Sequence, residues 1–410
     1  MNIENFRQSL LSYDFSGNPT ESGFIETGFG SIACFTNEFW TSGQRRASSI
    51  HEVSYRACYK PQLPAFFIKL LTEECDTVYD PFGGRGTTAI EAGLSGRKVI
   101  SNDVNPLSAV FVKPRLNIPS YGEIEFRLNE ISGMPLKEAD QDLSMFYHAD
   151  TLREIATLRE YLAKRSFEGS SDSTDDWIRM VATNRLTGHS KGFFSVYSLP
   201  PNQAVTPDRQ ILINKKLNQI PEYRNVKDLI LKKTETLFKK LTGQERENLK
   251  KAGQTAMLLT GEAHKTEDIP DDTVKLTVTS PPFLDVVDYA TDNWLRCWFN
   301  SIDTDEVTKK ITSIRSPEKW ADYMQLVFNE LYRITSPGGW VAFEVGEVKK
   351  GKIKLEEFVI PIGIKAGFEC ACVLINSQVF TKTSNIWGIN NNSKGTNSNR
   401  ITIFRKKDRN

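Results

Sequence analysis

The sequence predicts an α/β protein with a doubly wound, mostly parallel sheet, interrupted by a large insertion. Residues 77–103 follow the order strand, glycine-rich turn, helix, strand, which is the repeating unit of such sheets. A second alternation of strands and helices begins at Met257. Between them, residues 115–253 lose this alternation. We therefore expect a Rossmann-like domain formed by residues 51–114 and 254–410, an inserted lobe at 115–253, and an N-terminal extension at 1–50.

The composition is that of a soluble globular protein, with 39% hydrophobic and 25% charged residues in a chain of 410. The net charge is only +1, so any nucleic-acid site must come from local clustering of basic residues. Six scattered cysteines without a CxxC pair, and only four histidines, argue against a metal site or a disulfide framework. No signal peptide and no apolar run near 18 residues is found, which favours a cytoplasmic protein without membrane contact.

The first half of the domain is predicted from hydrophobic spacing. Apolar residues from Leu63 to Leu71 recur at helical intervals after Pro61. Thr77–Tyr79 is predicted to be a short strand, and a helix packed closely on the sheet should follow the glycine-rich turn. The next strand spans 97–102 and ends at Asp103.

The second half repeats the same pattern along the rest of the chain. The last two strands should form a C-terminal antiparallel hairpin. Strands are expected at 257–259, 274–279, 340–345, 370–376 and 401–404, with helices near 289–300, 317–335 and 355–366.

The turn Asp80–Thr88 is the first candidate for ligand binding. Glycines between a strand and a helix let the backbone approach a ligand closely, and Asp103 is placed to accept hydrogen bonds from ribose hydroxyls. The segment is not a P-loop, because no Gly-Lys-Ser/Thr follows it. Taken alone, it is also compatible with a tight structural turn.

The second candidate is Thr279-Ser280-Pro281-Pro282-Phe283, at the end of an alternating strand. Ligands bind at the carboxyl ends of strands in such sheets. The two prolines stiffen the backbone and remove its donors, leaving carbonyl acceptors, one hydroxyl and one aromatic ring. These groups suit a flat ligand that carries an NH2 group. A lone Ser-Pro-Pro would more simply be a rigid exit from the strand.

Together the two motifs resemble those of S-adenosylmethionine-dependent amino-DNA methyltransferases. Asp80–Thr88 is similar to the cofactor motif of that family, and Thr279–Phe283 to its catalytic motif, in the Ser-Pro-Pro form common among N4-cytosine enzymes. Thr260–Ala263 and Ile269–Val274 are similar to the segments that precede the catalytic motif, and Tyr59–Pro64 to an additional cofactor motif. The resemblance covers roughly residues 55–110 and 256–405.

The resemblance implies the cofactor S-adenosyl-L-methionine and a set of site residues. Ser280 and the Pro281 carbonyl would hold the amine of a flipped base, next to Pro282, while Phe283 stacks on it. The cofactor would contact Tyr59, Lys60, Pro61, Asp80, Pro81, Phe82, Gly83, Gly84, Gly86, Thr87, Thr88, Asp103, Asn105, Glu262 and Ala263. A C5-cytosine enzyme would need a cysteine nucleophile next to proline, and the chain has none.

Two departures weaken the choice of cytosine N4 over adenine N6. Glu262 stands where the family usually has aspartate. The order of cofactor motif, insertion and catalytic motif is nearer to that of adenine enzymes. An N6-adenine DNA methyltransferase, an RNA base-amine methyltransferase and an inactive DNA-binding relative therefore remain alternatives.

The insertion is predicted to read the sequence of double-stranded DNA. Between Arg209 and Lys251, twelve lysines and arginines stand against five acids, which suits phosphate contact. We expect DNA contacts from Asn184, Arg185, His189, Asn202, Gln203, Lys232 and Lys233, and from Asn385 and Arg400 in or beside a loop at 381–400 rich in amides and hydroxyls. A solvated basic helix beside an inert lobe is the alternative. We also expect the protein to belong to a restriction-modification system with a cognate restriction endonuclease. It should be a monomer or a homodimer.

Overall fold

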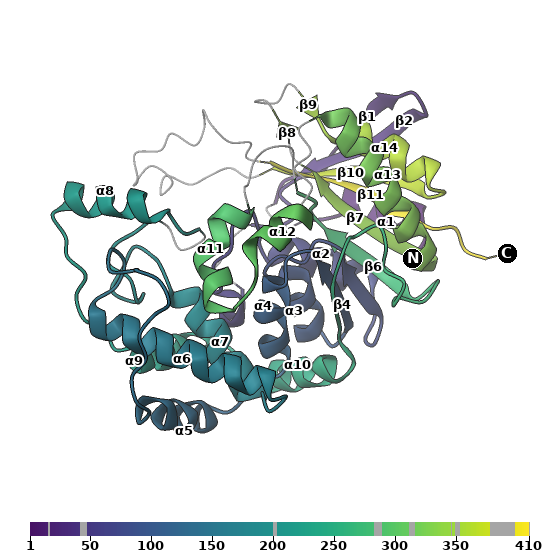
Figure 1. Cartoon of the computed structure of the whole chain (residues 1–410). Helices are drawn as coiled ribbons and strands as arrows, with labels where there is room; N and C mark the ends of the chain where they lie inside the picture. The colour runs from purple at the N-terminus through teal and green to yellow at the C-terminus, as the bar shows by residue number, and fades with distance from the viewer. Residues whose placement is uncertain are drawn as a thin grey trace.

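The structure is a computed structural model of the whole chain. The residues that it describes are 1–14, 17–41, 47–199, 203–282, 289–310, 316–345, 347–348, 353–377 and 398–409. Figure 1 shows a twisted sheet with helices on both sides and a lobe of helices at one end.

The described residues form a sheet of nine strands in the order β1-β2-β10-β11-β7-β6-β3-β4-β5. β3, β4, β5, β6 and β7 pair in parallel, whereas β11 runs antiparallel to both β7 and β10. This confirms the predicted fold class, including the C-terminal hairpin. The strands are β1 Glu21–Thr27, β2 Gly30–Asn37, β3 Thr77–Asp80, β4 Lys98–Asp103, β5 Met257–Thr260, β6 Val274–Thr279, β7 Thr335–Val345, β10 Glu369–Ser377 and β11 Ser398–Arg405, with β8 Glu347–Val348 and β9 Ile353–Lys354 as a separate short pair.

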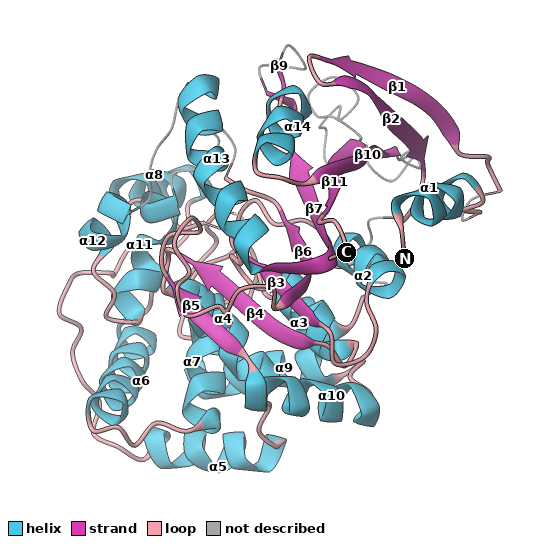
Figure 2. Cartoon of the chain, turned by 90° about the vertical axis from the view of Figure 1, so that its right-hand side faces the viewer, coloured by secondary structure: helices cyan, strands magenta, loops and turns pink. Residues whose placement is uncertain are grey.

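Alternating side chains of the strands supply two hydrophobic cores, one on each face of the sheet. On β7, Trp340 and Ala342 belong to one core, and Val341 and Phe343 belong to the other. The first core lies under α2 Gln62–Leu71, α3 Thr87–Leu94, α4 Leu107–Leu116 and α10 Gly243–Thr255. The second lies under α13 Pro317–Ile334 and α14 Glu356–Lys365, on the opposite face (Figure 2). Helix α11 Tyr289–Phe299 and helix α12 Thr304–Lys310 follow the predicted catalytic motif.

Residues 1–50 are part of the sheet rather than a separate extension. Strand β2 pairs in parallel with β10, from Cys34 opposite Val373 to Asn37 opposite Asn376. Helix α1 Ile3–Leu11 packs Phe6 on Trp340, with ring centroids 5.0 Å apart. The short 3-10 helix η2 Ser49–His51 then leads into the domain.

The insertion folds as a helical lobe made of α5 Tyr121–Ser132, α6 Ala149–Phe167, α7 Ser173–Arg185, α8 Pro207–Leu217 and α9 Val226–Phe238. Capping boxes begin α5 at Ser120 and α7 at Asp172, which explains why these polar stretches start helices. The lobe packs on the domain mainly through α7 against α4 (Figure 1). Helix α10, which the sequence assigned to the insertion, instead packs on α3 and covers the sheet. Among the described helices, none has the length and apolar character needed to cross a bilayer.

The packing of Phe6 predicts that the N-terminal helix stabilises the whole domain. Phe6 is completely buried, so Phe6→Ala should lower the free energy of unfolding by about 3–5 kcal/mol. Phe24, on β1, is 73% exposed, and Phe24→Ala should change it by less than about 0.5 kcal/mol. Urea unfolding of both variants measures the difference. Equal, small effects would mean that the N-terminal helix is not part of the cooperative unit.

Candidate active site

The glycine-rich turn lies tightly against the end of strand β4. The Gly83 N–H donates to the Asn102 carbonyl at 2.8 Å, and a Cβ on Gly83 would lie 2.4 Å from Ser101 Oγ. Gly84 and Gly86 have φ angles of +52° and +78°, which side chains other than glycine disfavour. The glycines are therefore required both by the close approach to β4 and by the backbone conformation of the turn.

Asp103 closes this turn from the end of β4. Its Oδ2 accepts from the Gly84 N–H at 2.7 Å, and its Oδ1 accepts from the Asn105 N–H at 2.8 Å. Burial raises the pKa of Asp103 to about 6, although both hydrogen bonds oppose that shift. A carboxylate has about four acceptor positions, so Asp103 keeps the capacity to accept from hydroxyl groups of a ligand.

Asp80 joins the three predicted motifs to one another. Its Oδ1 accepts from the Thr279 hydroxyl at 2.6 Å and from the Phe82 N–H at 3.1 Å, and its Oδ2 accepts from the Tyr59 hydroxyl at 2.8 Å. The side chain is 1% exposed, and burial raises its pKa. Asp80 therefore positions the turn, the Tyr59 segment and the start of the Ser-Pro-Pro segment, and its oxygens do not face a ligand.

Thr88, in the first turn of α3, extends this network. Its hydroxyl donates to the Val278 carbonyl at 3.0 Å and lies 2.5 Å from the Tyr59 hydroxyl. Thr87 is also buried, beside the Arg85 guanidinium, whose Nε lies 3.2 Å from Thr87 Oγ1. These two threonines hold the start of α3 against β6 and the preceding loop.

Ser280 follows β6 and donates its hydroxyl to the carboxylate of Glu344 on β7. Asn399, on β11, donates to the same carboxylate. Glu344 is 7% exposed, and burial raises its pKa to about 7. Glu344 was not among the residues predicted from the sequence. An acid one residue before the end of the apolar run Trp340–Val345 could have indicated it, because neighbouring parallel strands end at the same edge of the sheet.

The two prolines of this segment are in different surroundings. Pro281 is buried, whereas Pro282 is exposed and its carbonyl accepts from the Trp320 indole N–H at 3.1 Å. This bond fixes the chain direction after Ser280. Phe283 lies outside the described residues, as do Asn202 and Asn385.

The segment before α2 folds over the glycine-rich turn. The Tyr55 ring lies 3.7 Å from the position that a Cβ on Gly84 would occupy. Arg85 donates to the carbonyls of Val53, at 2.8 Å, and Tyr59, at 3.4 Å. Burial, with a smaller effect of Arg85, lowers the pKa of Lys60, and Pro61 begins helix α2. Tyr55 and Arg85 were not predicted, because nothing in their local pattern distinguishes them from ordinary core residues.

An ion pair connects this segment to the helix after the catalytic motif. Arg56 Nη1 lies 2.5 Å from Asp292 Oδ2 on α11. The segment 53–60 therefore contacts both the turn and α11, which places it between the two predicted motifs.

Glu262 and Ala263 follow β5 after Gly261, beside the end of β4. The Gly261 carbonyl accepts from the Asn102 amide at 2.9 Å, and the Gly261 N–H donates to the Asp103 carbonyl at 3.2 Å. Ala263 is buried, whereas Glu262 is half exposed and lies 3.3 Å from His264 Nε2. The structure thus brings the Gly-Glu-Ala segment to the same edge as Asp103 and the glycine-rich turn.

The DNA-reading residues predicted in the lobe are only partly at the surface. Asn184 and Arg185 are buried: Asn184 donates to the Ser54 carbonyl at 2.9 Å, and the Arg185 guanidinium lies 4.0 Å from the centre of the Phe193 ring. Burial lowers the pKa of Arg185 to about 10. We therefore withdraw both residues as readers of base edges, because their polar groups are already used inside the protein.

Of the remaining residues predicted to contact DNA, some are paired inside the protein and others lie at its surface. Lys233 lies 3.5 Å from Glu52, and burial lowers its pKa to about 8. Arg400 pairs with the buried Glu356 at 2.6 Å. These two cations serve the fold, whereas His189 and Lys232 are exposed and Gln203 is half-buried. A count of charges along the sequence does not distinguish cations paired inside the protein from cations at its surface. In the described part of the chain, no three His, Cys, Asp or Glu side chains gather as a metal site.

Comparison with known proteins supports the predicted resemblance in one part of the chain. Residues 34–108 match a family model described as DNA methylase, of the N6/N4 type. The type II methyltransferase M.PvuII of Proteus hauseri is 43% identical over 53 residues, which are 13% of this chain and 16% of that protein. The matched residues 34–108 contain the Tyr59 segment, the glycine-rich turn and Asp103, so the predicted resemblance to amino-DNA methyltransferases is confirmed for this segment.

Likenesses to solved structures are weaker. TTHA0409 of Thermus thermophilus, solved in complex with S-adenosyl-L-methionine, is 22% identical, with a TM-score of 0.24, over 37% of this chain and 55% of its own. TrmN from the same organism is 11% identical, with a TM-score of 0.32, over 96% of this chain and 61% of its own. The chain thus spans about a sixth of M.PvuII and about half of TTHA0409. TM-scores this low carry no information about function.

The raised pKa of Glu344 predicts a specific pH dependence of stability. Its pKa is about 7 in the folded protein and about 4.3 in an unfolded chain. The protonated side chain therefore stabilises the folded state fully below about pH 4.3, and this stabilisation is lost as the pH rises through 7. Glu344→Gln should remove this loss, so that the free energy of unfolding falls less between pH 5 and pH 8 than in the wild type. Urea unfolding at both pH values tests this. Glu357→Gln, at an exposed position on α14, is the control and should follow the wild type.

Proposed function

We propose that the protein transfers a methyl group from S-adenosyl-L-methionine to an exocyclic amine of a DNA base, and that the amine is N4 of cytosine. The observation that carries the proposal is the network around Asp80. It holds the glycine-rich turn and the end of β6, which Ser280 follows, at one edge of the sheet. The turn that we propose as the cofactor cradle therefore lies next to the residues that we propose as amine acceptors, as methyl transfer between two bound molecules requires.

The residues at this edge fit S-adenosyl-L-methionine. The turn at Gly83 and Gly84 has no side chains, so its backbone can approach a ligand closely. Asp103 would accept from the ribose hydroxyls with its remaining acceptor positions, and Glu262 and Ala263 would lie beside the adenine. Asp80 would act through the residues that it positions. When bound, the cofactor supplies a methyl group activated by the positive charge of its sulfonium.

Ser280 would orient the target amine. Its hydroxyl hydrogen is directed to Glu344, so its oxygen lone pairs are available to accept an N–H of the base. The Pro281 carbonyl would accept the other N–H. Two acceptors on the amine hold its nitrogen towards the methyl donor and increase its electron density. The base must leave the duplex to reach this position, which costs a few kcal/mol.

Glu344 would take up the proton that methylation releases. When the amine nitrogen forms its bond to carbon, it must lose one of its hydrogens. Ser280 would accept that proton and pass its own to the Glu344 carboxylate. A pKa of about 7 suits a group that accepts and then releases a proton near neutral pH. Because Glu344 must be ionised to accept it, the rate should increase as the pH rises through about 7.

The choice of cytosine N4 rests on Ser280 before the two prolines, the form common among N4-cytosine enzymes. The type II methyltransferase M.PvuII, similar over 53 residues, makes a restriction-modification role and a cognate endonuclease part of the proposal. Adenine N6 is the alternative target, and a base amine in RNA is a further one. All three require the same cradle and the same acceptors, so the product distinguishes them.

Asp103 should control cofactor affinity in a pH-dependent way. Asp103→Asn should weaken S-adenosyl-L-methionine binding about tenfold or more, because a neutral amide is a poorer acceptor for hydroxyl groups. In the wild type, affinity should fall as the pH decreases through about 6, where Asp103 becomes protonated. Calorimetric titration between pH 5 and pH 8 measures both effects. Asp268→Asn, at an exposed position, is the control. Unchanged affinity in folded Asp103→Asn would contradict the assignment.

Ser280 should control turnover rather than cofactor affinity. Ser280→Ala should lower kcat for methyl transfer to DNA by about 100-fold, because it removes an acceptor for the base amine and the path of the released proton. The affinity for S-adenosyl-L-methionine should stay unchanged, because Ser280 is not one of the residues proposed to contact the cofactor. Ser336→Ala is the matched control, since Ser336 lies at the opposite end of the parallel strands and its hydroxyl donates to the Val274 carbonyl.

The product identifies the target atom. Mass spectrometry of nucleosides from DNA methylated by the wild type should give N4-methylcytosine. N6-methyladenine alone would refute the choice of cytosine, and methyl incorporation into RNA but not DNA would refute the choice of nucleic acid.

A further inference from the structure

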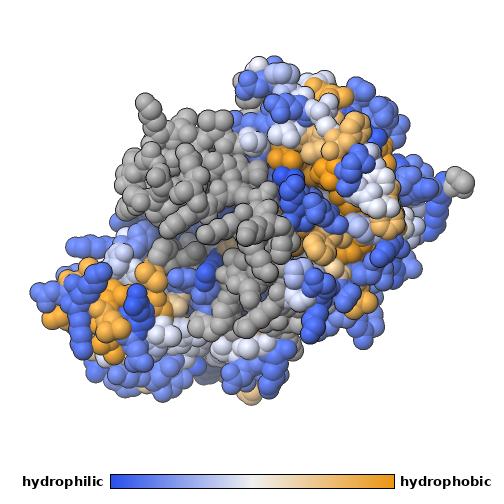
Figure 3. Space-filling model, turned by 90° about the horizontal axis from the view of Figure 1, so that it is seen from above, coloured by the Kyte–Doolittle hydropathy of each residue, from blue (hydrophilic) through white to orange (hydrophobic). Residues whose placement is uncertain are grey.

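Helix α8 exposes apolar side chains beside its charged ones and buries a polar side chain, which an ordinary surface helix does not do. Ile211 and Leu212 are 37% and 56% exposed, whereas Gln210 is completely buried. Figure 3 shows hydrophobic residues gathered on the lobe at the left, where α8 lies in Figure 1. An exposed apolar surface of this kind on a globular protein indicates a binding surface.

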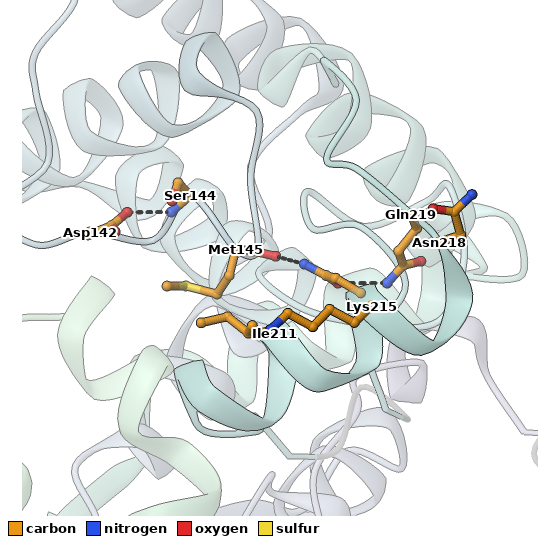
Figure 4. Close-up of a pocket in the computed structure, with 8 residues that line it drawn as sticks. Asp142, Ser144, Met145, Ile211, Lys215, Asn218 and Gln219 are labelled. Atoms are coloured by element: carbon orange, nitrogen blue, oxygen red, sulfur yellow. Dashed lines mark hydrogen bonds between the residues drawn. The ribbon is translucent and has the colours of Figure 1, made fainter.

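The inner side of α8 is held mainly by amide side chains. Gln210 and Gln219 donate to the Tyr197 carbonyl, both at 2.9 Å. Asn214 donates to the Met145 carbonyl at 2.7 Å (Figure 4). An open pocket of about 430 Å³ lies between Asp142–Met145 and the side of α8 that carries Ile211 and Lys215 (Figure 4). These hydrogen bonds and the packing of Ile213 on the core hold the helix in position, and Ile211 and Leu212 stay exposed.

The chain that leads into α8 is attached to the helix after the catalytic motif. The Ala204 N–H donates to the Asp292 carbonyl at 2.8 Å, and the Trp294 indole N–H donates to the Val205 carbonyl at 3.0 Å. Thr206 then caps α8, two residues after Ala204. A duplex with a base flipped into the site at Ser280 must continue on both sides of that base, and α11 is the first described helix after Ser280.

The charges of α8 distinguish between two possible occupants. Arg209, Lys215 and Lys216 are exposed, and in the described part of the chain no acidic side chain forms an ion pair with them. Asp208 lies in the first turn, where its charge suits the helix dipole. Ile211 precedes Lys215, and Leu212 precedes Lys216, by four residues, so apolar and basic groups share one face. In a symmetric dimer formed through this face, the lysines of one copy would face those of the other and repel them. The negative phosphates of DNA would instead attract these lysines.

We propose that α8 is a DNA-contacting helix, in which Lys215 and Lys216 bind phosphates while Ile211 and Leu212 contact base edges in a groove. A helix is about 10–12 Å wide with its side chains, and the major groove is about 12 Å wide. There, apolar side chains contact the methyl group of thymine. The inference rests on the proposed function, since it takes duplex DNA as the substrate. It replaces the buried Asn184 and Arg185 with an exposed element of the same lobe.

Two double variants separate the two kinds of contact. Lys215→Gln with Lys216→Gln should weaken binding to a pool of random 30-base-pair duplexes about tenfold at 0.1 M salt, and should reduce the slope of log affinity against log salt by about two. Lys250→Gln with Lys251→Gln, at exposed positions on α10, is the control. It removes the same number of positive charges and should leave the slope unchanged.

Ile211→Ser with Leu212→Ser should lower methyl incorporation into genomic DNA about tenfold, with S-adenosyl-L-methionine affinity unchanged. Phe126→Ser with Phe167→Ser is the control, because these side chains are 66% and 93% exposed on α5 and α6. Serine at exposed positions should not unfold the protein, and circular dichroism verifies this.

Three results would overturn the inference. The first is that both α8 variants behave like their controls while the wild type methylates DNA. The second is that light scattering finds a wild-type dimer which Ile211→Ser with Leu212→Ser converts to a monomer without loss of DNA methylation, so that the face binds a second copy. The third is that the wild type incorporates no methyl group into DNA. Because this last result is seen with the wild type, before any substitution is made, it shows that the proposed function itself is wrong.

Discussion

The buried carboxylate of Asp80 is the interaction on which the arrangement of the candidate site depends. A carboxylate with almost no solvent contact must satisfy its oxygens inside the protein, and here Thr279, Tyr59 and the Phe82 N–H do so. These donors come from three segments that are far apart in the sequence. Leaving a buried oxygen of Asp80 without a donor would cost free energy. The glycine-rich turn, the Tyr59 segment and the end of β6 are therefore held in a single arrangement.

A second buried acid, Glu344, lies at the same edge in a different environment. Asp80 accepts from three protein groups that stay in place, whereas Glu344 accepts from Ser280, which the proposed chemistry uses. The raised pKa of Glu344 follows from burial that its donors only partly offset. At this edge of the sheet, Asp80 therefore fixes the geometry, whereas Glu344 is able to titrate near neutral pH.

The features that could be predicted from the sequence are those encoded in short stretches of it. The strands at 77–80, 98–103 and 274–279 follow from alternation or short apolar runs, and the glycine-rich turn from its own residues. Glu344 was overlooked although it lies near the end of an apolar run. Tyr55 could not be identified from a short stretch, because its importance comes from neighbours more than 25 residues away. The positions of β1 and β2 in the sheet were missed for the same reason. Arg185 and Lys233 were misjudged because a count of charges along the chain contains no information about burial.

The parallel pairing of β2 with β10 has a consequence for how the chain reaches its native state. The Arg7 guanidinium donates to the Ala371 carbonyl across 364 positions, and the Phe39 N–H donates to the Asn376 side chain across 337. On a ribosome, the first forty residues therefore emerge long before their partners exist. Contacts this distant in sequence slow folding, and an unpaired strand is prone to association with other chains in the interval. The hairpin β1–β2, whose partners are adjacent, can close early and protect one side of β2 until β10 is synthesised.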